Sequence, residues 1–148
     1  MAPLIVLLVS ALLFWLAGET GVVAAFRDLG LVLRAALGVM FLLTASAHWG
    51  KRRGDLVRMV PPALPRPELL VTFTGVLEIL GAIGLFVPIT ARAACICLAL
   101  LLVALFPANI HAAHKHLTIA GRPVPGLPVR AAIQLVFIST LIAAAWLR

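Results

Sequence analysis

One carboxyl group, that of Glu78, lies in the middle of a long apolar stretch. The stretch runs from Glu68 to Val87, and Glu78 stands ten residues into it. A charged side chain at the centre of a bilayer costs roughly 2.5–3.5 kcal/mol even on mild insertion scales. Thr74, Glu78 and Gly81 fall within about 60° on a helical wheel, so we expect this face to contact other helices. Glu78 is either a group that transfers a proton or binds a ligand, or a buried hydrogen-bond partner that fixes helix packing.

Three other apolar stretches also carry polar side chains. All of these side chains lie in the half of the predicted bundle that faces the cytoplasm. His48 stands at the end of one stretch, Asn109 follows Pro107, and Arg130 and Gln134 are i,i+4 neighbours on a helix face. Each has a simple explanation: a helix cap for His48, repair of the interrupted helix for Asn109, and snorkelling for Arg130. One polar pocket open to the cytoplasm would explain all of them together. We therefore predict a site with Glu78 and His48 as catalytic groups, and Asn109, Gln134, Arg130 and Thr74 as ligand-binding groups.

Three histidines form the pattern H-x-x-H-x-H, with a lysine among them. His111 and His114 could share a helix face and bind a metal. No cysteine, aspartate or glutamate lies nearby to complete a ligand set, and Lys115 would repel a metal ion. We therefore predict exposed histidines at a membrane surface and no metal site, and no cofactor can be assigned.

The elements that position these groups follow from composition. The chain has 148 residues, of which 64% are hydrophobic and only 11% charged. An ordinary soluble domain is about 45–50% apolar and about 25% charged. So short a chain cannot bury this excess in water, which predicts an integral membrane protein. The net charge of +7 comes from residues between apolar stretches, which favours anionic lipid over nucleic acid as its partner.

Four stretches have the roughly 20 apolar residues that a membrane span requires, namely 29–49, 68–87, 91–113 and 127–147. A fifth, 3–18, reaches only about 24 Å as a helix. It could be a short span, a signal-like segment or an interfacial helix, although it lacks a basic n-region. We predict an all-α membrane protein, a four-helix transmembrane bundle with an additional short N-terminal transmembrane helix. Residues 1–148 form one domain, with 1–28 as the extra segment and 29–148 as the bundle.

Basic residues predict the orientation. Eight of them lie in or beside the two long connections, 50–67 and 114–126, and four on the opposite side. The positive-inside rule then places both connections in the cytoplasm of a multi-pass protein of a bacterial-type inner (plasma) membrane. Within the first connection, apolar residues alternate with charged ones before a proline-rich run, which predicts a short amphipathic turn. This turn either rests on lipid or covers a cavity.

Several short motifs occur in a specific order over residues 38–147. They are Ser46-Ala47-His48-Trp49, Met59-Val60-Pro61, Leu64-Pro65-Arg66-Pro67, Thr74-Gly75-Val76-Leu77-Glu78 with Gly81, Gly84-Leu85 and Pro88, Phe106-Pro107-Ala108-Asn109-Ile110-His111-Ala112-Ala113, and Arg130 with Gln134. In these motifs the chain resembles the DoxX-like family of small four-helix membrane proteins. The first 28 residues depart from that pattern.

The resemblance implies a four-helix bundle and, by analogy with some members, an association with membrane redox systems. It also implies His48, Glu78, Asn109, Arg130 and Gln134 as the candidate site. We expect a protein that binds a small hydrophobic, quinone-like or lipid-like molecule and assists a redox partner protein. The alternatives are a membrane isomerase or oxidoreductase that uses Glu78 for proton transfer, a small proton-coupled transporter, and a scaffold. Whether the protein is an enzyme stays open, and its glycine-lined face could equally serve a homodimer.

Overall fold

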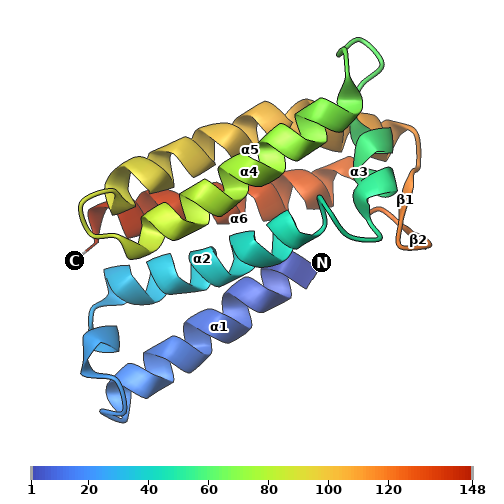
Figure 1. Ribbon diagram of the computed structural model, residues 1–148. Helices are drawn as coiled ribbons and strands as arrows, with labels where there is room; N and C mark the ends of the chain where they lie inside the picture. Colours follow the sequence, from blue (N-terminus) through green and yellow to red (C-terminus); the bar gives the residue numbers. More distant parts are fainter. Residues whose placement is uncertain (1, 148) are drawn as a thin grey trace.

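The computed structural model describes residues 2–147, and these are almost entirely helical (Figure 1). Five helices are long and apolar enough to cross a membrane. They are α1 (Ala2–Glu19), α2 (Leu29–Ser46), α4 (Pro67–Phe86), α5 (Ala91–His114) and α6 (Leu127–Trp146). Each corresponds to one of the five apolar stretches, so the prediction of a helical protein with several helices of membrane-spanning length is confirmed.

The predicted boundaries differ from the observed ones mainly at the end of α2. We expected this helix to continue to Trp49, but it ends at Ser46 and the chain then turns. Its start is well defined, because the Asp28 side chain accepts hydrogen bonds from the backbone N–H groups of Gly30 and Leu31, at 2.8 and 3.3 Å. Such a cap satisfies N–H groups that have no partner inside the helix.

Four of the long helices form a closed set of contacts. α2 packs against α4 and α6, and α5 packs against the same two helices, while α1 lies along the outside of α2 (Figure 1). The buried apolar core lies where they meet and includes Leu37, Phe41, Leu85, Leu98 and Leu141. α1 is 18 residues long, about 27 Å at the usual helical rise, so it is close to the length that a span requires.

Glycines allow the closest approaches between helices. A Cβ atom on Gly38 of α2 would lie 2.5 Å from the ring of Phe86, and one on Gly75 of α4 would lie 2.7 Å from His48. These pairs define an antiparallel alignment of α2 and α4. The predicted role of small residues on the Glu78 face, to let a neighbouring helix approach, is therefore confirmed.

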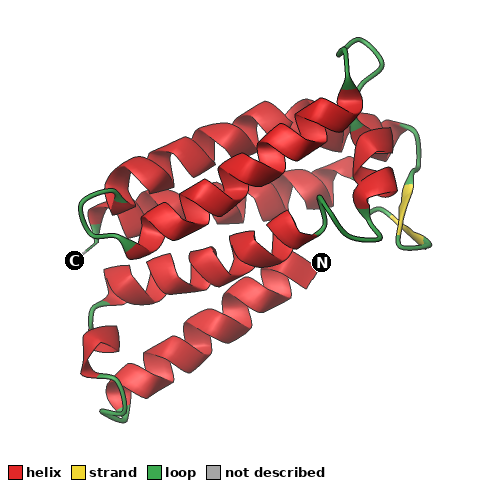
Figure 2. Cartoon of the chain, viewed as in Figure 1, coloured by secondary structure: helices red, strands yellow, loops and turns green. Residues whose placement is uncertain are grey.

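The two basic connections meet at one end of the molecule. The first contains a short helix, α3 (Arg53–Met59), where we predicted an amphipathic turn. The second contains a hairpin that we did not predict, formed by β1 (Thr118–Ile119) and β2 (Arg122–Pro123) (Figure 2). Asp55 Oδ2 accepts a hydrogen bond from the Ala120 N–H at 2.8 Å and so joins them. A 3-10 turn, η1 (Ala24–Arg27), connects α1 to α2 at the opposite end.

Candidate functional site

Glu78 is buried between α4 and α2. Only 5% of its surface is exposed, and its Oε2 atom lies 2.7 Å from the hydroxyl of Thr44. The same hydroxyl lies 2.9 Å from the carbonyl oxygen of Phe41. Glu78 is about 16 Å from the start of α4 at the helical rise, and thus near the middle of the span. Its orientation toward another helix agrees with the prediction from the helical wheel.

His48 lies one helical turn beyond Thr44, just after the end of α2. It is buried, and its Nδ1 atom lies 3.2 Å from the carbonyl oxygen of Thr44, as expected for a residue that caps a helix end. Burial lowers the pKa of this imidazole from its usual 6.5, and the nearby cation of Arg53 lowers it further, while the Thr44 carbonyl opposes the shift. Arg53 also donates to the carbonyl oxygen of His48 at 2.7 Å. His48 is therefore held in place as a neutral side chain at neutral pH.

Thr74, a predicted ligand-binding residue, is partly buried. Its hydroxyl donates to the carbonyl oxygen of Val71 at 3.1 Å, so its hydrogen bond stays within α4. Thr44 takes the position opposite Glu78 instead. Thr44 is not among the site residues that we predicted from the sequence, and only the contact between α2 and α4 identifies it as the partner of the carboxyl group.

A second polar group lies between α5 and α6. Asn109 donates to Gln134 Oε1 at 3.0 Å and accepts a hydrogen bond from the guanidinium of Arg130. Gln134 in turn donates to the carbonyl oxygen of Leu102 at 3.0 Å. Both observed side-chain bonds of Asn109 thus run to α6, whereas we had considered that it repairs the helix at Pro107. The polar atoms link the two helices.

This second group faces a groove of about 190 Å³. Asn109, Arg130 and Gln134 supply its polar side chains, and the rest of its lining is apolar. Those residues are Pro3, Leu4, Leu102, Pro125, Ile133 and Phe137. The first turn of α1 therefore forms one wall, which no pattern in the sequence indicated.

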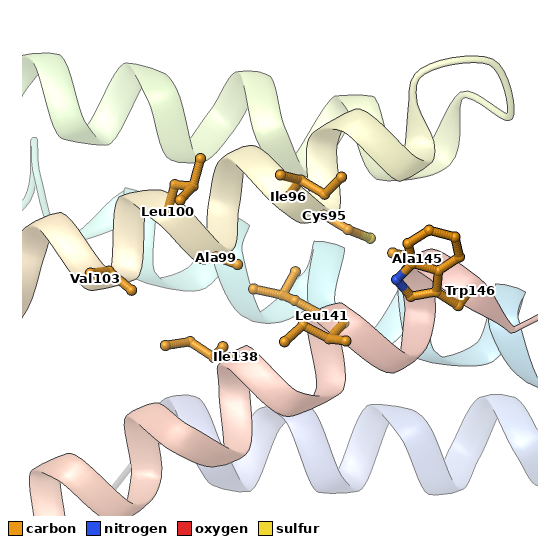
Figure 3. A pocket seen from close by; sticks show the side chains of 10 residues that line it. Cys95, Ile96, Ala99, Leu100, Val103, Ile138, Leu141, Ala145 and Trp146 are labelled. Carbon is orange, nitrogen blue, oxygen red and sulfur yellow. The ribbon is translucent and has the colours of Figure 1, made fainter.

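Another hollow, of about 230 Å³, lies further along α5 and α6 (Figure 3). Its lining is almost wholly apolar, with the thiol of Cys95 and the indole of Trp146 as its main heteroatoms. Ligand sites normally combine an apolar lining with a few placed polar groups that orient the molecule. This hollow lacks such a set, so the groove at Arg130 is the better candidate.

The structure thus brings the predicted residues together as two groups rather than one. Thr44, His48 and Glu78 lie at the contact of α2 and α4, while Asn109, Arg130 and Gln134 lie at that of α5 and α6. Among residues 2–147, no hydrogen bond joins one group to the other, and only the second lines the groove. Both groups lie between helices.

The three histidines of the H-x-x-H-x-H pattern differ in their exposure. His111 is partly buried, whereas His114 and His116 are exposed. Over the described part of the chain, no group of three or more His, Cys, Asp or Glu side chains could hold a metal ion.

The fold and these two polar groups define a helical protein with five helices of membrane-spanning length, and with polar side chains between them. Residues 37–148 match the family described as "Domain of unknown function (DUF8561)", and the chain belongs to this family. The matched region contains both polar groups but begins after α1. No curated protein and no solved structure matches the chain.

Proposed function

We propose that this protein binds an amphipathic, lipid-like or quinone-like molecule in the groove between α1, α5 and α6. The observation that carries this proposal is the convergence of Asn109, Arg130 and Gln134 on one end of an otherwise apolar groove. Buried polar groups are costly unless they have partners, so their concentration at a hollow favours a site that receives polar atoms.

The proposal includes a finer architecture and an orientation. α2, α4, α5 and α6 form a four-helix transmembrane bundle, and α1 adds a fifth span that closes the groove. The connections 50–67 and 114–126 face the cytoplasm of a bacterial inner membrane, because they carry most of the basic residues. The groove then opens at the cytoplasmic end of the protein.

The proposal also extends to the DoxX-like family that the motifs resemble. Those motifs carry the residues of both polar groups except Thr44, which supports a shared type of site. By that analogy the protein acts as an accessory subunit that supplies its ligand to a membrane redox partner.

The experiment is native mass spectrometry of the protein in mild detergent, followed by extraction of any bound molecule. We expect a discrete adduct on the wild type that is lost in Gln134→Leu, which keeps the approximate side-chain size and removes one of the two amides in the groove. Ile138→Ala, in the apolar hollow further along α6, is the matched control and retains the adduct. An adduct that survives Gln134→Leu and Asn109→Leu would contradict the proposed location.

A second candidate function is proton transfer by Glu78, as in an isomerase or oxidoreductase. It is favoured by one observation, the burial of this carboxyl group beside a neutral hydroxyl with no salt bridge to it among residues 2–147. Conversion of a bound apolar molecule by the wild type, lost in Glu78→Gln while binding persists, would support it. Equal conversion by both proteins would rule out this role for Glu78.

A further inference from the structure

The hydrogen bonds around the groove leave a surplus of donors. The side-chain oxygen of Asn109 already accepts from Arg130, and that of Gln134 already accepts from Asn109. A guanidinium has five N–H groups, and here one of its nitrogens, Nη2, bonds to Asn109. Arg130 Nε is buried and has no hydrogen-bond partner within residues 2–147. Each amide oxygen keeps one free lone pair, so the groove offers more free donors than free acceptors.

The charge of Arg130 is also uncompensated. The chain has five acidic residues, and the two salt bridges among the described residues join Arg34 to Asp28 and Arg58 to Asp55. Neither involves Arg130. A partly buried cation with no anion beside it is unfavourable unless a ligand or solvent supplies the opposite charge.

The size and depth of the groove restrict what could supply that charge. Its volume of 190 Å³ is that of about six water molecules in the liquid. Pockets that enclose a whole drug-sized molecule begin at roughly 300 Å³, so this groove is too small for one. Arg130 is only about 4–5 Å from the start of α6, which is the depth of lipid head groups rather than of the bilayer centre. The groove thus suits a compact head group whose apolar tail extends along the helices into lipid.

We propose that the ligand is an amphiphile with an anionic oxygen head group, a carboxylate or a phosphate, which pairs with the guanidinium of Arg130. This inference rests on the proposed function and specifies its ligand class. The planar guanidinium can bind two oxygens of such a group at once, and charged hydrogen bonds are roughly twice as strong as neutral ones. A quinone carbonyl would satisfy the free donors but would leave the charge unpaired.

The test compares ligands that differ only in the head group. The full-length protein in neutral detergent is titrated, at a pH where the acid is ionised, with oleate and with oleyl alcohol, and binding is followed by native mass spectrometry. Lysophosphatidate and inorganic phosphate form a second pair, which distinguishes a lipid head group from a free anion. We expect oleate and lysophosphatidate to bind at least about tenfold more tightly than oleyl alcohol, or about 1.4 kcal/mol, and inorganic phosphate to bind weakly.

Variants separate this inference from the proposed function. Arg130→Gln should abolish the preference for the charged head, Arg130→Lys should keep part of it, and Arg66→Gln, an exposed arginine outside the groove, should leave it unchanged. Equal binding of oleate, oleyl alcohol and decylubiquinone would overturn the anionic ligand while leaving the proposed binding function intact. Tight binding of inorganic phosphate alone would overturn the amphiphile. Binding of none of these probes would overturn both.

Discussion

The hydroxyl of Thr44 has one proton and two oxygen neighbours, Glu78 Oε2 at 2.7 Å and the Phe41 carbonyl at 2.9 Å. It can donate to only one of them at a time. A protonated Glu78 resolves the conflict, because its own O–H donates to Thr44 while Thr44 donates to Phe41. The geometry therefore suits a neutral carboxyl group.

This arrangement predicts the effect of removing the hydroxyl. Thr44→Val keeps the shape but leaves the Glu78 carboxyl buried without its partner, so we expect a loss of about 1–3 kcal/mol in stability. Thermal unfolding in a fixed detergent measures it. Thr44→Ser, which keeps the hydroxyl, should lose clearly less, and equal losses for the two variants would show that the hydrogen bond contributes little.

The lowered pKa of His48 predicts a dependence of stability on pH. Burial disfavours the protonated ring in the folded protein, so the unfolded chain binds more protons on acidification. The stability is fully present above the ordinary pKa of 6.5 and is lost as the pH falls through the lower pKa of the folded state. Unfolding temperatures measured at about pH 7.5 and about pH 5 should therefore show a drop.

Variants assign that drop to its source. His48→Gln should reduce it, because the variant has no titrating ring at this position. His114→Gln removes an exposed histidine and should show the same drop as the wild type. The assignment to His48 is wrong if the two variants respond alike.

At the scale of elements, the contact between α2 and α4 determines how the buried carboxyl group is held. Gly75 allows His48 and Trp49 to lie directly against α4, and Thr44 then faces Glu78 one turn away. The position of α4 along α2 therefore sets both the close approach and the hydrogen bond.

A methyl group at Gly75 should disturb both. Its Cβ atom would lie 2.7 Å from the Cβ atom of His48, and such overpacking typically costs about 1–3 kcal/mol. We expect Gly75→Ala to lower the unfolding temperature. Gly54→Ala in α3, where no atom lies within 4 Å, is the control and should be neutral or slightly stabilising. Equal behaviour of the two variants would contradict the packing described here.

α1, unlike the other long helices, lies wholly outside residues 37–148, the region that matches the family. Its first turn nevertheless forms a wall of the groove. For the ligand proposed above, α5 and α6 would supply the polar contacts and α1 one apolar wall.

At the scale of the whole molecule, five antiparallel helices place the start of α1 at the end that carries α3 and the hairpin (Figure 1). The α1–α2 connection lies at the opposite end, with the end of α6. A bundle of four spans with α1 lying flat on the membrane would instead keep both ends of α1 on one side.

Labelling of single cysteines distinguishes these arrangements. In a background with Cys95 and Cys97 replaced by alanine, a membrane-impermeant maleimide should reach Ala2→Cys and Lys51→Cys from one side, and Gly21→Cys from the other. The physical reason is that α1 has the length and hydropathy of a span. Reaction of Ala2→Cys and Gly21→Cys from the same side would show that α1 does not cross the membrane.

The long helices could be predicted from the sequence because their cause is local. Each helix satisfies its own backbone hydrogen bonds, and about 20 mainly apolar residues suffice to span a bilayer, so α2, α4, α5 and α6 appear as long, mostly apolar runs. The alternation of charged and apolar residues predicted an amphipathic turn where the short helix α3 lies. The inward direction of Glu78 followed from the helical wheel and the cost of a charge in lipid.

The partners of these residues depended on the tertiary structure. In a membrane protein both the buried and the lipid-facing sides of a helix are apolar, so the pattern along one helix does not specify which neighbour it meets. The pairing of Thr44 with Glu78, the bridge from Asn109 to Arg130 and Gln134, and the wall built by Pro3 and Leu4 join residues distant in the chain. These contacts arise only when the helices pack. As a result, the residues that the sequence assigned to one polar pocket lie in two separate polar groups.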